Sequence, residues 1–259
     1  MLQVTYSVHR KPGISTTSSL PAPRYTNAVP LFGPLHLALL GATAAIAVAL
    51  PWLCRRGVIP GRAARFVIGW ALVANELGWW AFRYSHEGLH ARNLPLQLCD
   101  LTVWLAVLAC LTARRAIVEF AYFAGIAGAG MALLTPDLWS PWPTYPAIYF
   151  FMAHGGIVIG VALMAFGGMV RFRRGAVWRS FGWLVAYAVP VGAFNAVFGS
   201  NYMYLCRKPA SATVLDKLGP WPWYLLAAAV AGLGLFWLLW LPLRAAAADG
   251  PSAQPVVGA

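Results

Sequence analysis

The sequence predicts an all-α membrane protein, a bundle of seven transmembrane helices with the N-terminus outside and the C-terminus cytoplasmic. Three observations lead to this fold class. Of the 259 residues, 60% are hydrophobic and only 10% are charged, whereas soluble domains carry about a quarter charged residues. The apolar residues form stretches of bilayer-spanning length, ~17–25 residues each. The basic residues lie in short clusters between these stretches, which is typical of membrane topology signals.

Seven apolar stretches account for the expected helices, which we place at 35–53, 66–83, 94–112, 116–134, 146–170, 177–199 and 222–243. They form one transmembrane domain, 35–243, between an N-terminal tail, 1–34, and a C-terminal tail, 244–259, that we expect to be disordered. Only the turn Thr112 to Arg115 separates the third stretch from the fourth, so these two helices are expected to form an antiparallel hairpin. Residues 1–30 lack the apolar core of a cleavable signal peptide, so we expect the first helix to direct insertion.

The distribution of lysine and arginine gives the bundle its direction. More of these residues lie in 54–65, 112–115, 171–179 and the C-terminal tail than in the opposite connections, and basic connections face the cytoplasm. This pattern explains the net charge of +12 without nucleic acid as a partner. The partner that the composition predicts is the lipid bilayer.

Strongly polar residues inside the expected helices are candidates for function, because polar groups are costly in a bilayer. They are Asn75, Glu76, Gln97, Cys99, Asp100, Glu119, His154 and Asn195, and Asn201 and Tyr202 follow just beyond the outer end of 177–199. Glu119 is explained by a local salt bridge to Arg114 or Arg115. The others require another explanation.

Helical rise places two of these residues at one level. If the third helix starts near Leu94, Cys99 lies ~8 Å inside it, and His154 lies ~12 Å inside the helix that starts near Pro146. A thiol and an imidazole at one level predict nucleophilic catalysis, provided that the two helices touch. Cys99 would then lie in the second helical turn, where the field of the helix terminus has mostly decayed. The alternatives are a cysteine that only packs and a histidine that only hydrogen-bonds between helices.

A second motif suggests different chemistry. His86, Glu87 and His90 match H-E-x-x-H, in which one helix face carries two zinc ligands and a general base. The motif falls in the expected loop between the second and third helices and contains Gly88, which disfavours the continuous helix that zinc binding needs. Asp137 is a conceivable third ligand. A membrane zinc metallopeptidase is therefore the weaker alternative, and a non-enzymatic lipid-binding protein is a third.

Several sequence blocks resemble the YwaF-like family of bacterial integral membrane proteins. They are LPLQLCD at 94–100, His154-Gly155, NYMYL at 201–205, Lys208-Pro209, Leu215-Asp216 and LGPWP at 218–222, and they cover roughly 35–243. The family is similar to a vertebrate transmembrane acyltransferase that moves acyl chains between phospholipids with a proposed cysteine–histidine pair. The resemblance implies that Cys99 and His154 are that pair, and that the protein resides in the bacterial cytoplasmic (inner) membrane.

The leading hypothesis is a membrane lipid acyltransferase or acyl hydrolase that forms a thioester on Cys99, with His154 as the general base. The residues expected to bind or orient the substrate are Gln97, Asp100, Asn75, Glu76, Asn195, Asn201 and Tyr202. This mechanism requires no cofactor and no metal. Its partners are a phospholipid or fatty acyl substrate and the bilayer, with no nucleic acid. The acyl donor, the acceptor and the oligomeric state stay open.

Overall fold

A computed structural model of the chain describes residues 29–91, 93–136, 138, 140–209 and 214–248. Within these residues the chain forms helices and no strand, which confirms the all-α class. The α-helices are α1 (Pro34–Arg55), α2 (Gly61–Glu87), α3 (Leu98–Thr112), α4 (Arg115–Leu134), α5 (Tyr145–Phe166), α6 (Ala176–Phe198) and α7 (Trp223–Ala248), with short 3-10 turns η1 (Tyr202–Tyr204) and η2 (Val214–Leu218).

Membrane-spanning character is clear for five of the helices described, namely α1, α4, α5, α6 and α7, which are long and apolar enough to cross a bilayer. The chain is therefore an integral membrane protein. The helix α3 is apolar but only 15 residues long, and α2 is long but carries several charged side chains. The count of seven spans and the orientation of the termini remain predictions.

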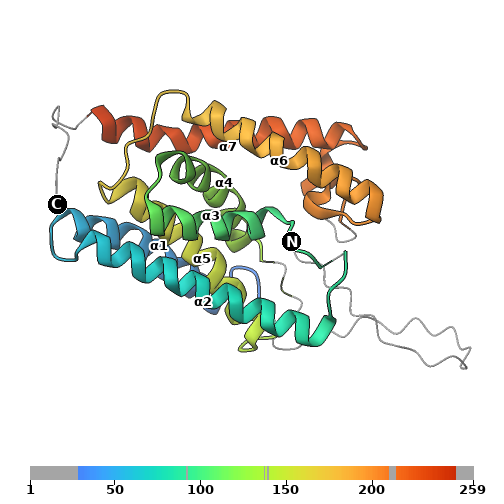
Figure 1. Cartoon of the computed structure of the whole chain (residues 1–259), viewed down its shortest axis with the longest axis horizontal. Coiled ribbons are helices and arrows are strands. Elements are labelled where there is room, and N and C mark those ends of the chain that lie inside the picture. The colour runs from blue at the N-terminus through green and yellow to red at the C-terminus, as the bar shows by residue number, and fades with distance from the viewer. Residues whose placement is uncertain (1–28, 92, 137, 139, 210–213, 249–259) are drawn as a thin grey trace, which may run out of the picture.

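The helix α5 forms the centre of the bundle. It packs against α1, α2, α3 and α4. In its most apolar segment 67% of the residues are buried, whereas the corresponding share for α1 is 6%. Figure 1 shows α6 and α7 side by side on one side of the bundle, and α1 and α2 on the other. The apolar core between these layers includes Tyr122, Phe123, Ile157 and Phe236.

Glycines bring the helices of the core close together. A Cβ atom on Gly156 of α5 would lie 2.7 Å from Leu72 Cδ2 of α2. A Cβ atom on Gly160 would lie 3.2 Å from the Sγ of Cys110 on α3. Small residues allow this close approach between membrane helices. The contact between α3 and α5, which the sequence analysis could only assume, is therefore present.

The observed boundaries differ from the expected ones where glycines or distant contacts decide them. The helix α2 extends to Glu87, and Gly88, with φ 72°, ends it. The helix α5 ends at Phe166, before Gly167 and Gly168. The helix α7 continues to Ala248, into the region expected to be a disordered tail. Most of both expected tails lies outside the described residues.

Glu119 forms a salt bridge, as predicted, but the prediction of Arg114 or Arg115 as its partner is wrong. The buried carboxylate accepts hydrogen bonds from Arg173 at 2.9 Å and Arg179 at 3.1 Å, whereas Arg114 and Arg115 are exposed. Arg173 lies in the connection between α5 and α6, and Arg179 lies near the start of α6. The interaction ties α4 to the start of α6.

Candidate functional site

The start of α3 differs from the prediction. The helix begins at Leu98 with Gln97 as its N-cap, and the four residues from Leu94 to Gln97 are not helical. The expected start near Leu94 is therefore wrong by four residues. Two contacts set this start. Asp100 Oδ2 accepts the Gln97 backbone N–H at 3.0 Å and caps the first turn, and the distant Tyr202 holds the backbone before it out of the helix.

Distant side chains provide hydrogen-bond partners for the non-helical stretch. The Leu94 N–H donates to the Tyr202 hydroxyl at 2.7 Å, and that hydroxyl donates to the Ala91 carbonyl at 2.9 Å. The Tyr187 hydroxyl donates to the Leu96 carbonyl at 3.2 Å. Burial also raises the pKa of Tyr202, so its hydroxyl stays protonated and able to donate. Irregular backbone persists at membrane depth only where protein groups bond to it in this way.

The helix α3 begins deep inside the bundle. Near one end of the antiparallel pair α2–α3, Arg65 of α2 donates to the Leu111 carbonyl of α3 at 3.0 Å. Further along, Glu76 of α2 interacts electrostatically with Asp100 of α3. From Glu76, α2 continues to Glu87 for ~16 Å at the helical rise, whereas only two helical residues precede Asp100 on α3. The last turns of α2 therefore extend well beyond the start of α3.

Cys99 is the second residue of α3 and lies in its first turn. The prediction of a second-turn position is therefore wrong, because the thiol lies beside the first backbone N–H groups of the helix. Electrostatic neighbours of the half-buried thiol are Glu76, Asp100, Tyr149 and Tyr187. Three of these four belong to other helices.

Glu76 is fully buried and has two hydrogen-bond donors. The Tyr149 hydroxyl donates to Oε2 at 3.0 Å, and Trp80 Nε1 donates to Oε1 at 2.8 Å. The Tyr149 ring is stacked on Trp79 at 4.2 Å. The sequence analysis missed Tyr149, Trp80 and Tyr187. A buried glutamate does signal a nearby donor, but nothing in the sequence identifies which aromatic residue supplies it.

The helix α4 contacts both α3 and α5, so these contacts show which turns of α3 and α5 lie at the same height in the bundle. A Cβ atom on Gly128 of α4 would lie 3.6 Å from Leu98 Cδ2, at the start of α3. One turn earlier, a Cβ atom on Gly125 would lie 2.9 Å from Ile157 Cγ2 of α5. The start of α3 and the turn of α5 that precedes Ile157 therefore meet α4 at one level.

His154 lies in that turn of α5, at the level of Cys99. The imidazole is buried, and its Nδ1 lies 2.7 Å from the Phe150 carbonyl, with the two rings 4.3 Å apart. Because a carbonyl can only accept, Nδ1 carries the proton, and in the neutral imidazole Nε2 is the acceptor, with no hydrogen-bond partner among the described residues. No hydrogen bond joins Cys99 to His154 among the residues that the structure describes.

Most of the expected orienting residues support the loop around Tyr202. Asn195 of α6 bonds to the Tyr202 backbone through both amide atoms, at 2.9 and 2.8 Å. Gln97 Oε1 accepts the Met203 N–H at 2.9 Å. The Asn201 side chain bonds within its own loop, to Arg207. Buried Asn75 Nδ2 has no partner among the described residues.

Comparison with known proteins decides the family. The model of the TMEM164 family matches residues 31–240, which include α1 to α6 and most of α7. The chain belongs to the TMEM164 family. No curated protein and no solved structure matches it.

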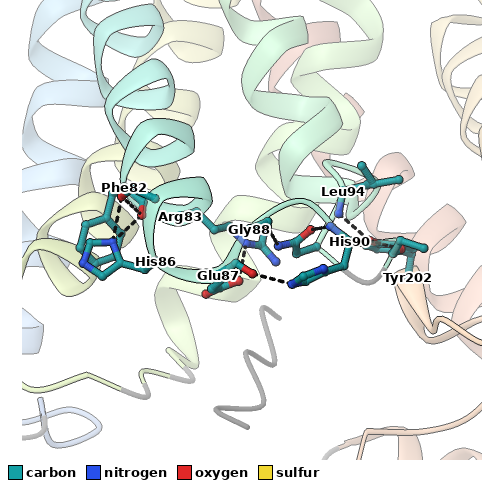
Figure 2. A network of polar contacts seen from close by, with 11 residues as sticks. Phe82, Arg83, His86, Glu87, Gly88, His90, Leu94 and Tyr202 are labelled. Atoms are coloured by element: carbon teal, nitrogen blue, oxygen red, sulfur yellow. Dashed lines mark hydrogen bonds and ion pairs between the residues drawn. The ribbon is translucent and has the colours of Figure 1, made fainter. Parts of the chain in front are cut away.

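The zinc motif of this TMEM164-family chain does not lie on one helix face. His86 and Glu87 end α2, whereas His90 lies in the following loop, with its Nε2 bonded to the Glu87 carbonyl. Figure 2 shows the His86 ring turned toward Phe82, away from His90. No group of three or more His, Cys, Asp or Glu side chains that could hold a metal occurs among the described residues, and Asp137 lies outside them.

An apolar groove lies on another side of α5. Its volume is about 320 Å³, and α1, α2 and α5 line it with residues that include Ile46, Leu72, Phe151, Gly155 and Ile159. His154 is not among the described residues that line it.

Proposed function

We propose that this TMEM164-family protein is a membrane lipid acyltransferase or acyl hydrolase, with Cys99 as nucleophile and His154 as general base. The observation that carries the proposal is that Cys99 lies at a helix terminus deep inside the bundle, at the level of a buried histidine with a free Nε2. In the topology proposed below, a phospholipid ester bond can reach the depth of Cys99. The resemblance to the YwaF-like family supports the same pair.

The chemistry has two stages. His154 Nε2 takes the thiol proton, and the Cys99 thiolate attacks the carbonyl carbon of a glycerophospholipid ester. The ester C–O bond breaks, the lysophospholipid alkoxide takes the proton from His154, and the acyl group remains on Sγ as a thioester. A lysophospholipid hydroxyl or water then gives its proton to His154 and attacks the thioester carbonyl. The C–S bond breaks, the new ester or free acid leaves, and the Cys99 thiolate takes the proton back from His154.

Two steps of this mechanism place demands on the site. Substrate binding must bring Sγ and Nε2 within hydrogen-bond reach, since catalytic hydrogen bonds often tighten only in the complex. The developing oxyanion needs donors, and the proposal assigns this role to N–H groups at the start of α3 and to the Gln97 amide nitrogen. Asn201 is a weaker candidate for this role because its amide is bonded within its loop.

The proposal includes a topology in which all seven α-helices cross the membrane, with the N-terminus outside, in a bacterial inner membrane. The short α3 can cross if the non-helical residues 94–97 complete the span. Fifteen helical residues rise ~22 Å, and four extended residues add ~13 Å, which together exceed the ~30 Å hydrocarbon layer.

The direct test compares lipid products of purified wild type and Cys99→Ala by mass spectrometry after incubation with a phospholipid and a lysophospholipid acceptor. We expect Cys99→Ala to lose turnover by at least ~100-fold, which is typical of nucleophile removal. Cys54→Ala, which removes a thiol at the far end of α1, is the matched control and should retain activity. If Cys99→Ala forms the wild-type products, the mechanism is wrong.

A non-enzymatic lipid-binding protein is the second candidate function, and the apolar groove between α1, α2 and α5 favours it. This candidate predicts that a lipid copurifies with the protein and that no acyl product forms with any phospholipid offered. Turnover that depends on Cys99 would exclude it.

A further inference from the structure

Arg83 of α2 is a buried cation with unused hydrogen-bond donors. The residue is 4% exposed, and Nε donates to Glu87 Oε2 at 3.2 Å. Buried Nη1 has no partner among the described residues. A guanidinium has five N–H donors that suit oxygen anions, and leaving a buried charged donor unpaired is costly. The mechanism above does not use this residue.

The surroundings of Arg83 show where an anion would bind. Figure 2 shows the side chain extending from α2 toward Gly88 and His90, on the side of Tyr202 and away from His86. The guanidinium interacts electrostatically with both Tyr202 and Asp100, and lies 5.6 Å from the Trp80 ring. The group therefore adjoins the network that holds the start of α3.

Two carboxylates share this region, and neither occupies the free donors. Asp100 already accepts the Gln97 N–H. The Glu87 side chain is 26% exposed, and among the described residues it bonds to Nε alone. Glu87 can therefore turn toward solvent while an incoming anion takes the guanidinium, which limits the repulsion between the two.

The position along α2 indicates the kind of anion. Arg83 lies seven residues beyond Glu76, which is ~10 Å closer to the end of the bundle, while Glu76 is an electrostatic neighbour of Cys99. In a glycerophospholipid the phosphate likewise lies nearer the membrane surface than the acyl ester bonds.

We propose that Arg83 binds the phosphate of a membrane phospholipid and thereby holds its ester bond toward Cys99. This deepens the proposed function, and rests on it only in taking the bound lipid as the substrate. Phosphate binding itself requires no turnover. The phosphate rather than the acyl chain then selects phospholipids over uncharged diacylglycerol.

The test measures lipid retention by native mass spectrometry of the detergent-purified full chain. The probes are dioleoyl phosphatidylethanolamine and dioleoylglycerol, which differ only in the phosphoethanolamine headgroup. We expect the wild type to retain the phospholipid at least ~10-fold better, the effect of one charge-assisted hydrogen-bonded contact. Equal retention of the two lipids by the wild type overturns the proposal, whether or not any variant folds.

Variants separate phosphate binding from a structural ion pair. Arg83→Gln should reduce phospholipid retention to the diacylglycerol level, whereas Glu87→Gln, which removes the same ion pair, should keep or increase it. If both variants lower the melting temperature equally and neither changes retention, Arg83 is only structural and the proposal is wrong.

Two further measurements identify the source of the phosphate and distinguish a failure of this proposal from a failure of the proposed function. If inorganic phosphate raises the melting temperature of wild type but not of Arg83→Gln, while the two lipids are retained equally, the ligand is free phosphate and the lipid assignment fails. Cys99→Ala should retain the phospholipid like wild type. Loss of activity without loss of retention therefore supports both proposals, and retention without any wild-type activity supports the phosphate site alone.

Discussion

The hydroxyl of Tyr149 on α5 donates a hydrogen bond to Oε2 of Glu76 on α2 at 3.0 Å, with both side chains buried between the helices. This bond fixes the two helices that flank the start of α3, and Cys99 is an electrostatic neighbour of both residues. The immediate surroundings of the thiol therefore depend on a contact between residues 73 positions apart.

We expect Tyr149→Phe to lower the free energy of unfolding by ~1–3 kcal/mol, because it leaves a buried carboxylate oxygen without this donor. Thermal unfolding in detergent measures the change. Tyr145→Phe, on the same helix at a more exposed position, is the control and should change stability little. In the double variant Tyr149→Phe/Glu76→Gln, additive losses would show that the two side chains do not interact.

Tyr202→Phe should destabilise the start of α3 and reduce lipid turnover together, because the hydroxyl bonds to Leu94 and Ala91. Loss of these two bonds costs ~1–3 kcal/mol. Tyr187→Phe loses one longer bond and should be milder in both respects. The measurements are melting temperature and the rate at which a thiol reagent labels Cys99. An unchanged labelling rate in Tyr202→Phe would show that Tyr202 does not position the thiol.

The pair Arg173 and Arg179 should act redundantly on Glu119. The arginine side chains are 43% and 39% exposed, whereas the carboxylate is 3% exposed. Each single alanine variant leaves one partner and should lose less than ~1 kcal/mol, since exposed ion pairs are weak. The double variant leaves a buried carboxylate unpaired and should lose ~3 kcal/mol. Arg174→Ala is the control in the same connection, and purely additive losses would contradict the shared-carboxylate arrangement.

Metal removal tests the zinc alternative. Since His86 and His90 do not share a helix face, we expect a zinc chelator and His90→Ala to leave lipid turnover unchanged. Metal analysis of the purified protein accompanies the assay. Activity that disappears with the chelator and returns with added zinc would favour the metallopeptidase-like site instead.

Reporter fusions test the topology. A fluorescent protein that folds only in the cytoplasm should be bright when fused to the C-terminus, whereas a periplasmic alkaline phosphatase fused there should be inactive, as basic connections facing the cytoplasm require. A fusion within the connection between α4 and α5 should give the opposite pair of results. If both fusion points lay on the same side of the membrane, the prediction that α5, α6 and α7 all cross it would be contradicted.

The sequence by itself determined that the chain is an α-helical membrane protein, where most of its helices lie and which polar residues deserve attention. These are local properties, because apolar length over about twenty residues and the cost of a buried polar group act along one helix. The α3–α4 turn at Ala113 was predictable for the same reason, and the structure confirms it.

Only the tertiary structure decided where α3 starts, what neutralises Glu119 and what surrounds Cys99. The Leu94 N–H bonds to Tyr202, 108 residues later, and Glu119 bonds to Arg173, 54 residues later. A buried polar group must find a partner, but its own sequence neighbours do not reveal which distant side chain folding brings to it. Cys99 is accordingly in the first turn of α3 instead of the second, because a tyrosine on a distant loop holds the preceding backbone out of the helix.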